Sequence, residues 1–192
     1  MEKLNINNYK AFLDKVNYDP IGIVAENNAN LRLSPKEFFD KQIEKFEIGD
    51  KTGCCLNYST YLMAKYYNTR LLMCKDGPNG IHCAVIYENK GKLYVCDPAK
   101  SKILNGEKSC YGTPIREYSF DNPDVEQEYS ILPYFSPNKN YNRSMILEIL
   151  RPADVIKVKF MNNLCQSDID DIIKDITSNN SIYIASGAPQ LN

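Results

Sequence analysis

Apolar positions along this chain recur with two different spacings, and the change between them predicts helices followed by strands. In the first 70 residues they recur three or four apart, which is the spacing of one helix face. We expect a short helix that is capped by Asn7 or Asn8 and runs through Val16, and a second helix from Ser34 to Glu47. A third helix, over residues 54–67, is apolar on nearly all sides and should be buried at the centre of the fold.

Beyond residue 70 the apolar residues gather in short, partly alternating runs between turn residues, which is typical of strands. The expected strands cover residues 70–74, 81–88, 92–97, 115–120, 127–132 and 154–160. Asn89-Lys90-Gly91 predicts a hairpin between two of them. A later helix from Ser167 should place Ile169, Ile172, Ile173 and Ile176 on one face, and Ser181–Ala185 should form a last strand.

Length and composition narrow the class of protein. The 192 residues suit a single domain, and 43% apolar with 24% charged residues is a globular composition. The net charge of −1 comes from interspersed charges, so no basic surface for nucleic acid is expected. No apolar run is long enough to span a membrane, and the first residues lack a signal peptide. We therefore expect a cytoplasmic protein, with delivery into another cell by a non-classical route as the alternative.

Seven cysteines without regular spacing indicate reduced thiols rather than a set of disulfides. There is no Cys-x-x-Cys pair, which argues against a structural zinc site. Phosphate-binding glycine motifs are also missing from the sequence. We expect no metal and no cofactor.

Three residues are candidates for chemistry: Cys55, His82 and Asp97. Cys55 lies at the start of the central helix, where the helix dipole favours a thiolate, and Gly53 would let a substrate backbone approach it. His82 is the only histidine, so any imidazole chemistry must use it. Each residue also has a structural interpretation: a buried thiol, a structural histidine, and an Asp-Pro pair that ends a strand.

The hairpin register decides whether His82 and Asp97 meet. With a two-residue loop, Lys90-Gly91, residue Ala84 lies opposite Asp97, and Asp97 is then diagonal to His82 on the same face. A three-residue loop would place Asp97 opposite Cys83 and separate the two, unless a bulge restored the alignment. The triad therefore depends on an even loop or on a compensating bulge.

The motifs Gly53-x-Cys55-x-Asn57-Tyr58-Ser59, His82-x-Ala84-Val85 and Tyr94-Val95-x-Asp97-Pro98 resemble those of the transglutaminase-like superfamily of the papain-type fold. The resemblance covers about residues 50 to 100. It implies an α+β fold in which a buried helix with a cysteine at its N-terminus packs on an antiparallel sheet that carries the histidine and the aspartate. In a single domain of residues 1–192, residues 50–100 would be the catalytic core, and residues 101–192 would complete the sheet and the cleft.

By the same resemblance, Cys55 would be the nucleophile, His82 the general base and acid, and Asp97 the residue that orients His82. The expected activity is acyl transfer that cleaves or exchanges an amide bond in a peptide or protein, as in a thiol peptidase, a glutamine deamidase or a transglutaminase. A catalytically inactive binding module with the same fold is the alternative, and a papain-type peptidase of another branch is a third interpretation.

The sequence departs from this family at the oxyanion site. It contains no tryptophan, and Gly49 stands where papain-type proteases carry a glutamine. The second oxyanion donor, beside the Cys55 backbone N–H, is therefore unassigned; Asn57 or a tyrosine are the candidates.

Overall fold

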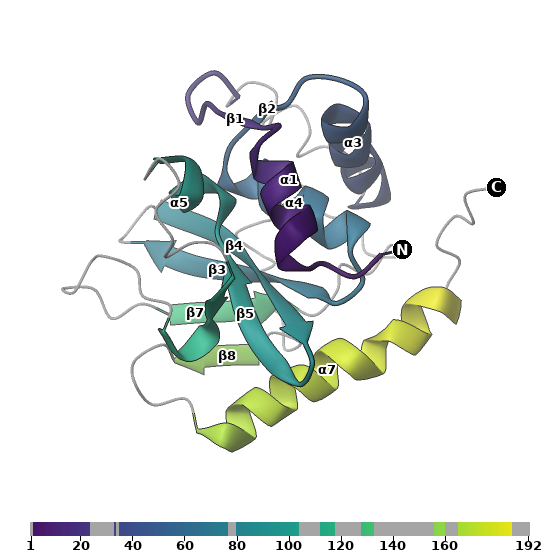
Figure 1. Ribbon diagram of the computed structural model, residues 1–192, viewed down its shortest axis with the longest axis vertical. Coiled ribbons are helices and arrows are strands. Elements are labelled where there is room, and N and C mark those ends of the chain that lie inside the picture. Colours follow the sequence, from purple (N-terminus) through teal and green to yellow (C-terminus); the bar gives the residue numbers. More distant parts are fainter. Residues whose placement is uncertain are drawn as a thin grey trace.

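The computed structural model describes residues 2–23, 33, 35–76, 80–103, 112–117, 128–132, 156–159 and 165–185. The helices are α1 (Ile6–Leu13), α3 (Pro35–Glu47), α4 (Cys55–Lys65), α5 (Pro98–Ile103) and α7 (Gln166–Ala185), with a 3-10 turn η2 (Ile115–Glu117) (Figure 1). The strands are β1 (Asn17–Tyr18), β2 (Thr52–Gly53), β3 (Thr69–Asp76), β4 (Gly80–Asn89), β5 (Lys92–Cys96), β6 (Thr113–Pro114), β7 (Glu128–Leu132) and β8 (Ile156–Lys159).

The main sheet has the strand order β6-β5-β4-β3-β7-β8, and each neighbouring pair is antiparallel. Strands β1 and β2 form a separate, short parallel ladder. The expectation of a mixed α+β fold with helices and an antiparallel sheet is thus confirmed.

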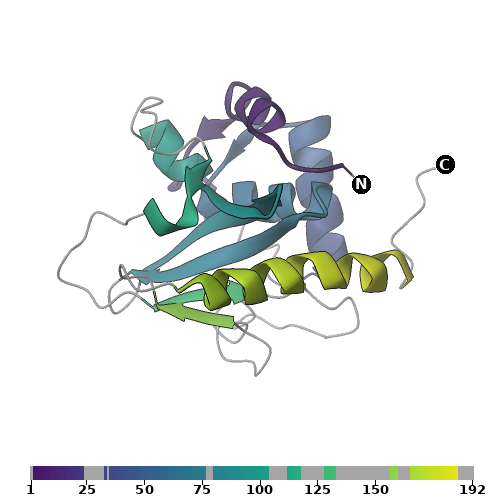
Figure 2. The same ribbon diagram turned by 60° about the horizontal axis from the view of Figure 1, so that its bottom comes forward.

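Helices lie on both faces of the sheet (Figures 1 and 2). On one face α7 contributes Ile169, Ile172 and Ile176 to a core that it shares with the sheet, as the spacing of the isoleucines predicted. On the opposite face a second core joins side chains from α1, α3 and α4 to the other side of β4 and β5. All seven residues from Asn57 to Met63 of α4 are buried, which confirms that this helix is central.

The β4–β5 hairpin has the two-residue loop on which the register argument depends. Asn89 pairs with Lys92, and the ladder continues without a bulge to the pair Val85–Cys96. Lys90 and Gly91 have φ angles of 52° and 72°, the left-handed conformation of a type I′ turn. The predicted even register is therefore confirmed.

Several predicted boundaries were wrong. Helix α1 is capped by Asn5 rather than Asn7 or Asn8, because Asn5 accepts hydrogen bonds from both of their backbone N–H groups, and it ends at Leu13 rather than Val16. The cap expected at Ser34 lies outside the described residues.

Two predicted strands were also wrong. Residues 115–117 form the turn η2 in place of a strand, because the short strand β6 ends at Pro114, which has no N–H to continue a ladder; residues 118–120 lie outside the described part. Residues 181–185 continue α7, where adding a turn to an existing helix overrides their β-type composition.

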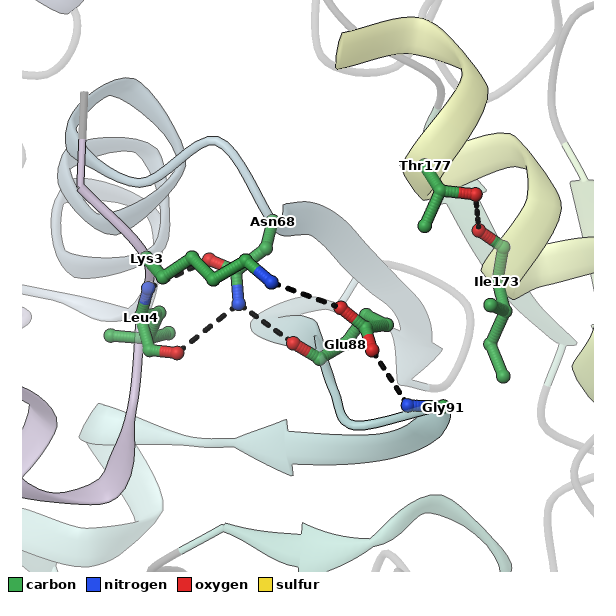
Figure 3. Close-up of polar contacts among 7 residues, drawn as sticks. All are labelled: Lys3, Leu4, Asn68, Glu88, Gly91, Ile173 and Thr177. Carbon is green, nitrogen blue, oxygen red and sulfur yellow. Dashed lines mark hydrogen bonds and ion pairs between the residues drawn. The ribbon is translucent and has the colours of Figure 1, made fainter.

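A buried asparagine attaches the N-terminal segment to the sheet (Figure 3). Asn68 is 1% exposed; its Oδ1 accepts from the Leu4 N–H at 2.7 Å, and its Nδ2 donates to the carbonyls of Leu4 (3.1 Å) and Glu88 (2.7 Å). Glu88 in turn accepts from the N–H of Gly91 at 2.7 Å, inside the hairpin turn. Asn68 thus joins the chain start to the hairpin that carries His82.

Replacing Asn68 with Ala should lower the free energy of unfolding by about 2–4 kcal/mol, because it leaves the buried Leu4 N–H and two carbonyls without their partner. Chemical denaturation of wild type and variant measures the change. Asn89→Ala, at an exposed position in the same hairpin, is the control and should stay within about 0.5 kcal/mol of wild type. Equal effects of the two substitutions would contradict the anchoring role of Asn68.

Candidate functional site

The start of helix α4 is fixed by a relay of buried polar side chains. Cys54 is the N-cap residue, and its backbone N–H donates to Asn57 Oδ1 at 3.1 Å. Asn57 Nδ2 donates to Gln42 Oε1 of α3, also at 3.1 Å, and both side chains are fully buried. The relay leaves Cys55 as the first residue of the helix, where no carbonyl of the helix itself can accept its N–H.

The two adjacent cysteines have different surroundings. The Cys54 thiol donates to Asn57 Oδ1 at 3.1 Å. A hydrogen bond with the Cys55 side chain, burial, and the charge on Cys55 together raise the pKa of Cys54 well above its usual range. Cys54 is therefore held as a neutral thiol that completes the helix cap. This difference supports Cys55 as the candidate nucleophile.

Gly53 has a packing reason to be a glycine. A Cβ atom at this position would lie 3.0 Å from atoms of Asn57, Phe46 and Tyr58. The residue is buried and pairs with Tyr18 in the β1–β2 ladder. Close packing against the aromatic core accounts for Gly53 without the substrate approach expected from the sequence.

His82 and Asp97 are brought together by the hairpin, as the register predicted. His82 Nε2 lies 2.7 Å from Asp97 Oδ2, and the Asp97 side chain is fully buried whereas that of His82 is 21% exposed. The second oxygen of Asp97 accepts from the Lys100 N–H at 3.0 Å. Asp97 therefore caps helix α5 and binds His82 at once, so the structural and the functional interpretations of the Asp-Pro pair both apply.

His82 also contacts the candidate nucleophile. The Cys55 thiol lies close enough to the His82 ring to interact with it, and this interaction, like that with Asp97, raises the pKa of His82. Since Nε2 is engaged by Asp97, Nδ1 is the ring nitrogen left for the thiol. The structure thus brings Cys55, His82 and Asp97 together in one chain of side-chain contacts.

His82 lies on β4 beyond the residue at which β4 and β5 stop pairing. Ala84 and Ile86, on the same side of β4 as His82, pack toward α7, whereas α4 packs on the opposite side. The β4–β5 ladder stops at Val85, so the part of β4 that contains His82 has no β5 residue beside it.

The charge of His82 is set by its two partners. Burial by itself would lower the pKa of His82, but the hydrogen bonds to Asp97 and Cys55, together with their negative charges, raise it to about 10. The imidazole is therefore positively charged at neutral pH. It would hold a thiolate on one side and is itself stabilised by the carboxylate on the other.

Sequence reasoning missed two residues of this region. Tyr18 lies close enough to Cys55 and Asp97 for their charges to act on its hydroxyl, and Gln42 of α3, 15 residues before Asn57, supports the cap of α4. Gln42 Nε2 is buried and has no hydrogen-bond partner among the described residues. Neither residue belongs to a recognisable motif; only the parallel β1–β2 pairing brings Tyr18 to the site.

Two further features concern the described residues as a whole. They contain no group of three His, Cys, Asp or Glu side chains that could hold a metal ion. Within the same ranges, no helix combines the length and the apolar character needed to cross a membrane. Comparison with protein-family models, curated proteins and solved structures finds no match to this chain.

Because His82 is the only histidine, NMR of its ring protons can follow its titration without overlap. The folded pKa should lie near 10, above the ordinary 6.5, so His82 stays charged through neutral pH and loses its proton only in alkaline solution. The pairing therefore stabilises the fold fully below about pH 6.5 and is lost as the pH rises toward 10.

Asp97→Asn should lower the pKa of His82 by about 1–3 units, because it removes the charge yet keeps an oxygen for the cap of α5. Asp50→Asn removes an exposed carboxylate and is the control. A wild-type pKa near 6.5 would contradict the charged state described above.

Proposed function

We propose that this protein is a cysteine-nucleophile acyl-transfer enzyme that cleaves or exchanges an amide bond in a peptide or protein. The observation that carries the proposal is the position of His82, whose Nε2 lies 2.7 Å from Asp97 Oδ2 and whose ring interacts with the Cys55 thiol. Nucleophile, base and orienting carboxylate in this order form the arrangement that activates a thiol for attack on a carbonyl.

In the proposed reaction, the Cys55 sulfur attacks the amide carbon, and the electrons of the C=O double bond move to the oxygen. When the tetrahedral intermediate collapses, the C–N bond breaks and His82 gives its proton to the departing amine. A thioester on Cys55 remains. Asp97 keeps its charge throughout and stabilises the imidazolium form of His82.

The fate of the thioester separates the possible activities. Water, losing a proton to His82, would release the acid; this outcome defines a peptidase or a glutamine deamidase. A lysine or a small amine would form a new amide, which defines a transglutaminase. We favour hydrolysis of an amide in a protein or peptide. These steps use only side chains of this chain and require no cofactor.

The arrangement of the core also supports a papain- or transglutaminase-like fold as part of the proposal. The buried helix α4 carries the cysteine at its N-terminus, and the antiparallel strands β4 and β5 lead to His82 and Asp97. In this proposal the helix and the hairpin form the catalytic core within residues 50–100. Strands β7 and β8 extend the same sheet beside β3. The proposal assigns them to the part of the single domain that completes the sheet and the cleft.

Alkylation by iodoacetamide near neutral pH tests the proposal. Cys55 should react faster than the other six cysteines, because it is the thiol that interacts with the His82 ring. His82→Ala should slow alkylation of Cys55 by roughly tenfold or more, since His82 supplies the stabilising charge. Peptide mass spectrometry identifies the modified residue and gives the rate.

Cys54→Ser is the matched control, because it removes the neighbouring thiol and keeps a hydrogen-bonding group at the cap; Cys55 should remain the fast residue. An inert Cys55 in the folded protein would exclude the enzyme and favour a binding module with the same fold.

A further inference from the structure

The proposed reaction needs a second hydrogen-bond donor for the oxygen that becomes negatively charged. The Cys55 backbone N–H, at the first turn of α4, is one donor. Asn57 is unsuitable as the other because it is fully buried and its side chain bonds Cys54 and Gln42. Tyr58 is also excluded, since it is buried and its hydroxyl donates to the Asn17 carbonyl.

Tyr18 is placed beside the nucleophile by the short β1–β2 ladder. Its partner in the register is Gly53, two residues before Cys55, and Asp19 N–H donates to the Gly53 carbonyl at 3.0 Å. The half-buried ring of Tyr18 packs near Tyr58, with the ring centres 6.4 Å apart. The backbone of Tyr18 is thus held by the segment that leads into α4, and its ring packs near a residue of α4 itself.

Resting on the function proposed above, we propose that Tyr18 is a catalytic residue whose hydroxyl donates a hydrogen bond to the oxyanion of the tetrahedral intermediate. Its position fits the role, because the β1–β2 ladder pairs Tyr18 with Gly53, two residues before Cys55, and the Tyr18 hydroxyl interacts electrostatically with Cys55. The proposal places the attacked substrate carbonyl between the sulfur and this hydroxyl. No proton is transferred: the O–H bond of Tyr18 stays intact, while the charge on the oxygen is shared with two donors.

The ionisation of Tyr18 agrees with this role. Burial, and after it the negative charges of Cys55 and Asp97, raise the pKa of Tyr18 above the ordinary 10. The hydroxyl therefore keeps its proton at neutral pH and remains a donor. One of these charged groups is the proposed nucleophile, Cys55. The Tyr18 hydroxyl is therefore near the site where the negative charge of the oxyanion would develop.

Two reactions of Cys55 distinguish an oxyanion donor from a residue that only positions the thiol. Acylation by p-nitrophenyl acetate passes through a tetrahedral oxyanion, whereas alkylation by iodoacetamide displaces iodide at a saturated carbon and forms none. Both rates are measured on the full chain as modification of the peptide that contains Cys55. Tyr18→Phe keeps the ring and removes only the hydroxyl.

We expect Tyr18→Phe to slow acylation of Cys55 by about 10- to 100-fold and to leave its alkylation within about twofold of wild type. Tyr94→Phe is the control, because Tyr94 is a half-buried tyrosine packed against the same aromatic core. This substitution should change neither rate. An alkylation rate close to that of wild type would also show that the Tyr18→Phe variant is folded.

Equal slowing of both reactions, or no slowing of acylation, would overturn the assignment of Tyr18 and leave the function proposed for Cys55 intact. A wild-type Cys55 that reacts with neither reagent faster than the other thiols would instead overturn the proposed function, and the role of Tyr18 with it.

Discussion

The hydrogen bond of 2.7 Å between His82 and Asp97 is the contact on which the candidate site depends. It exists because the hairpin turn at Lys90-Gly91 has two residues, both in the left-handed conformation. One more residue in the turn would move Asp97 to the other face of β5. The carboxylate is also committed to capping α5, so its position is fixed from two sides. A local feature of the turn thus determines the charge of a histidine at the far end of the hairpin.

A second constraint acts at the start of α4, where two adjacent cysteines differ in their tasks. Cys54 completes the cap through Asn57, which is held from behind by Gln42. Cys55 follows as the first helical residue and contacts His82. Gly53 and the aromatic residues around it fix the direction from which the chain enters the helix.

Much of this arrangement could be predicted from local sequence signals. Apolar spacing predicted the helix that starts near Cys54, and the Lys90-Gly91 turn predicted the hairpin and its register. The spacing of the isoleucines predicted the buried face of α7. Tyr18 and Gln42 could not be predicted, because tertiary pairing alone brings them to the site. The strand predicted at residues 181–185 was wrong for a related reason. Their composition favours a strand, but extending the preceding helix α7 costs less than starting a new element. The reason proposed for Gly53 was also incomplete, since the sequence does not reveal the aromatic side chains packed against it.

The central claim is that Cys55, His82 and Asp97 act as one unit, and a double-mutant cycle tests it most directly. The rate of Cys55 alkylation is measured in wild type, His82→Ala, Asp97→Asn and the double variant. If Asp97 acts through His82, the double variant should react as slowly as His82→Ala alone, because no imidazole remains for Asp97 to stabilise. Independent effects that multiply in the double variant would contradict the account.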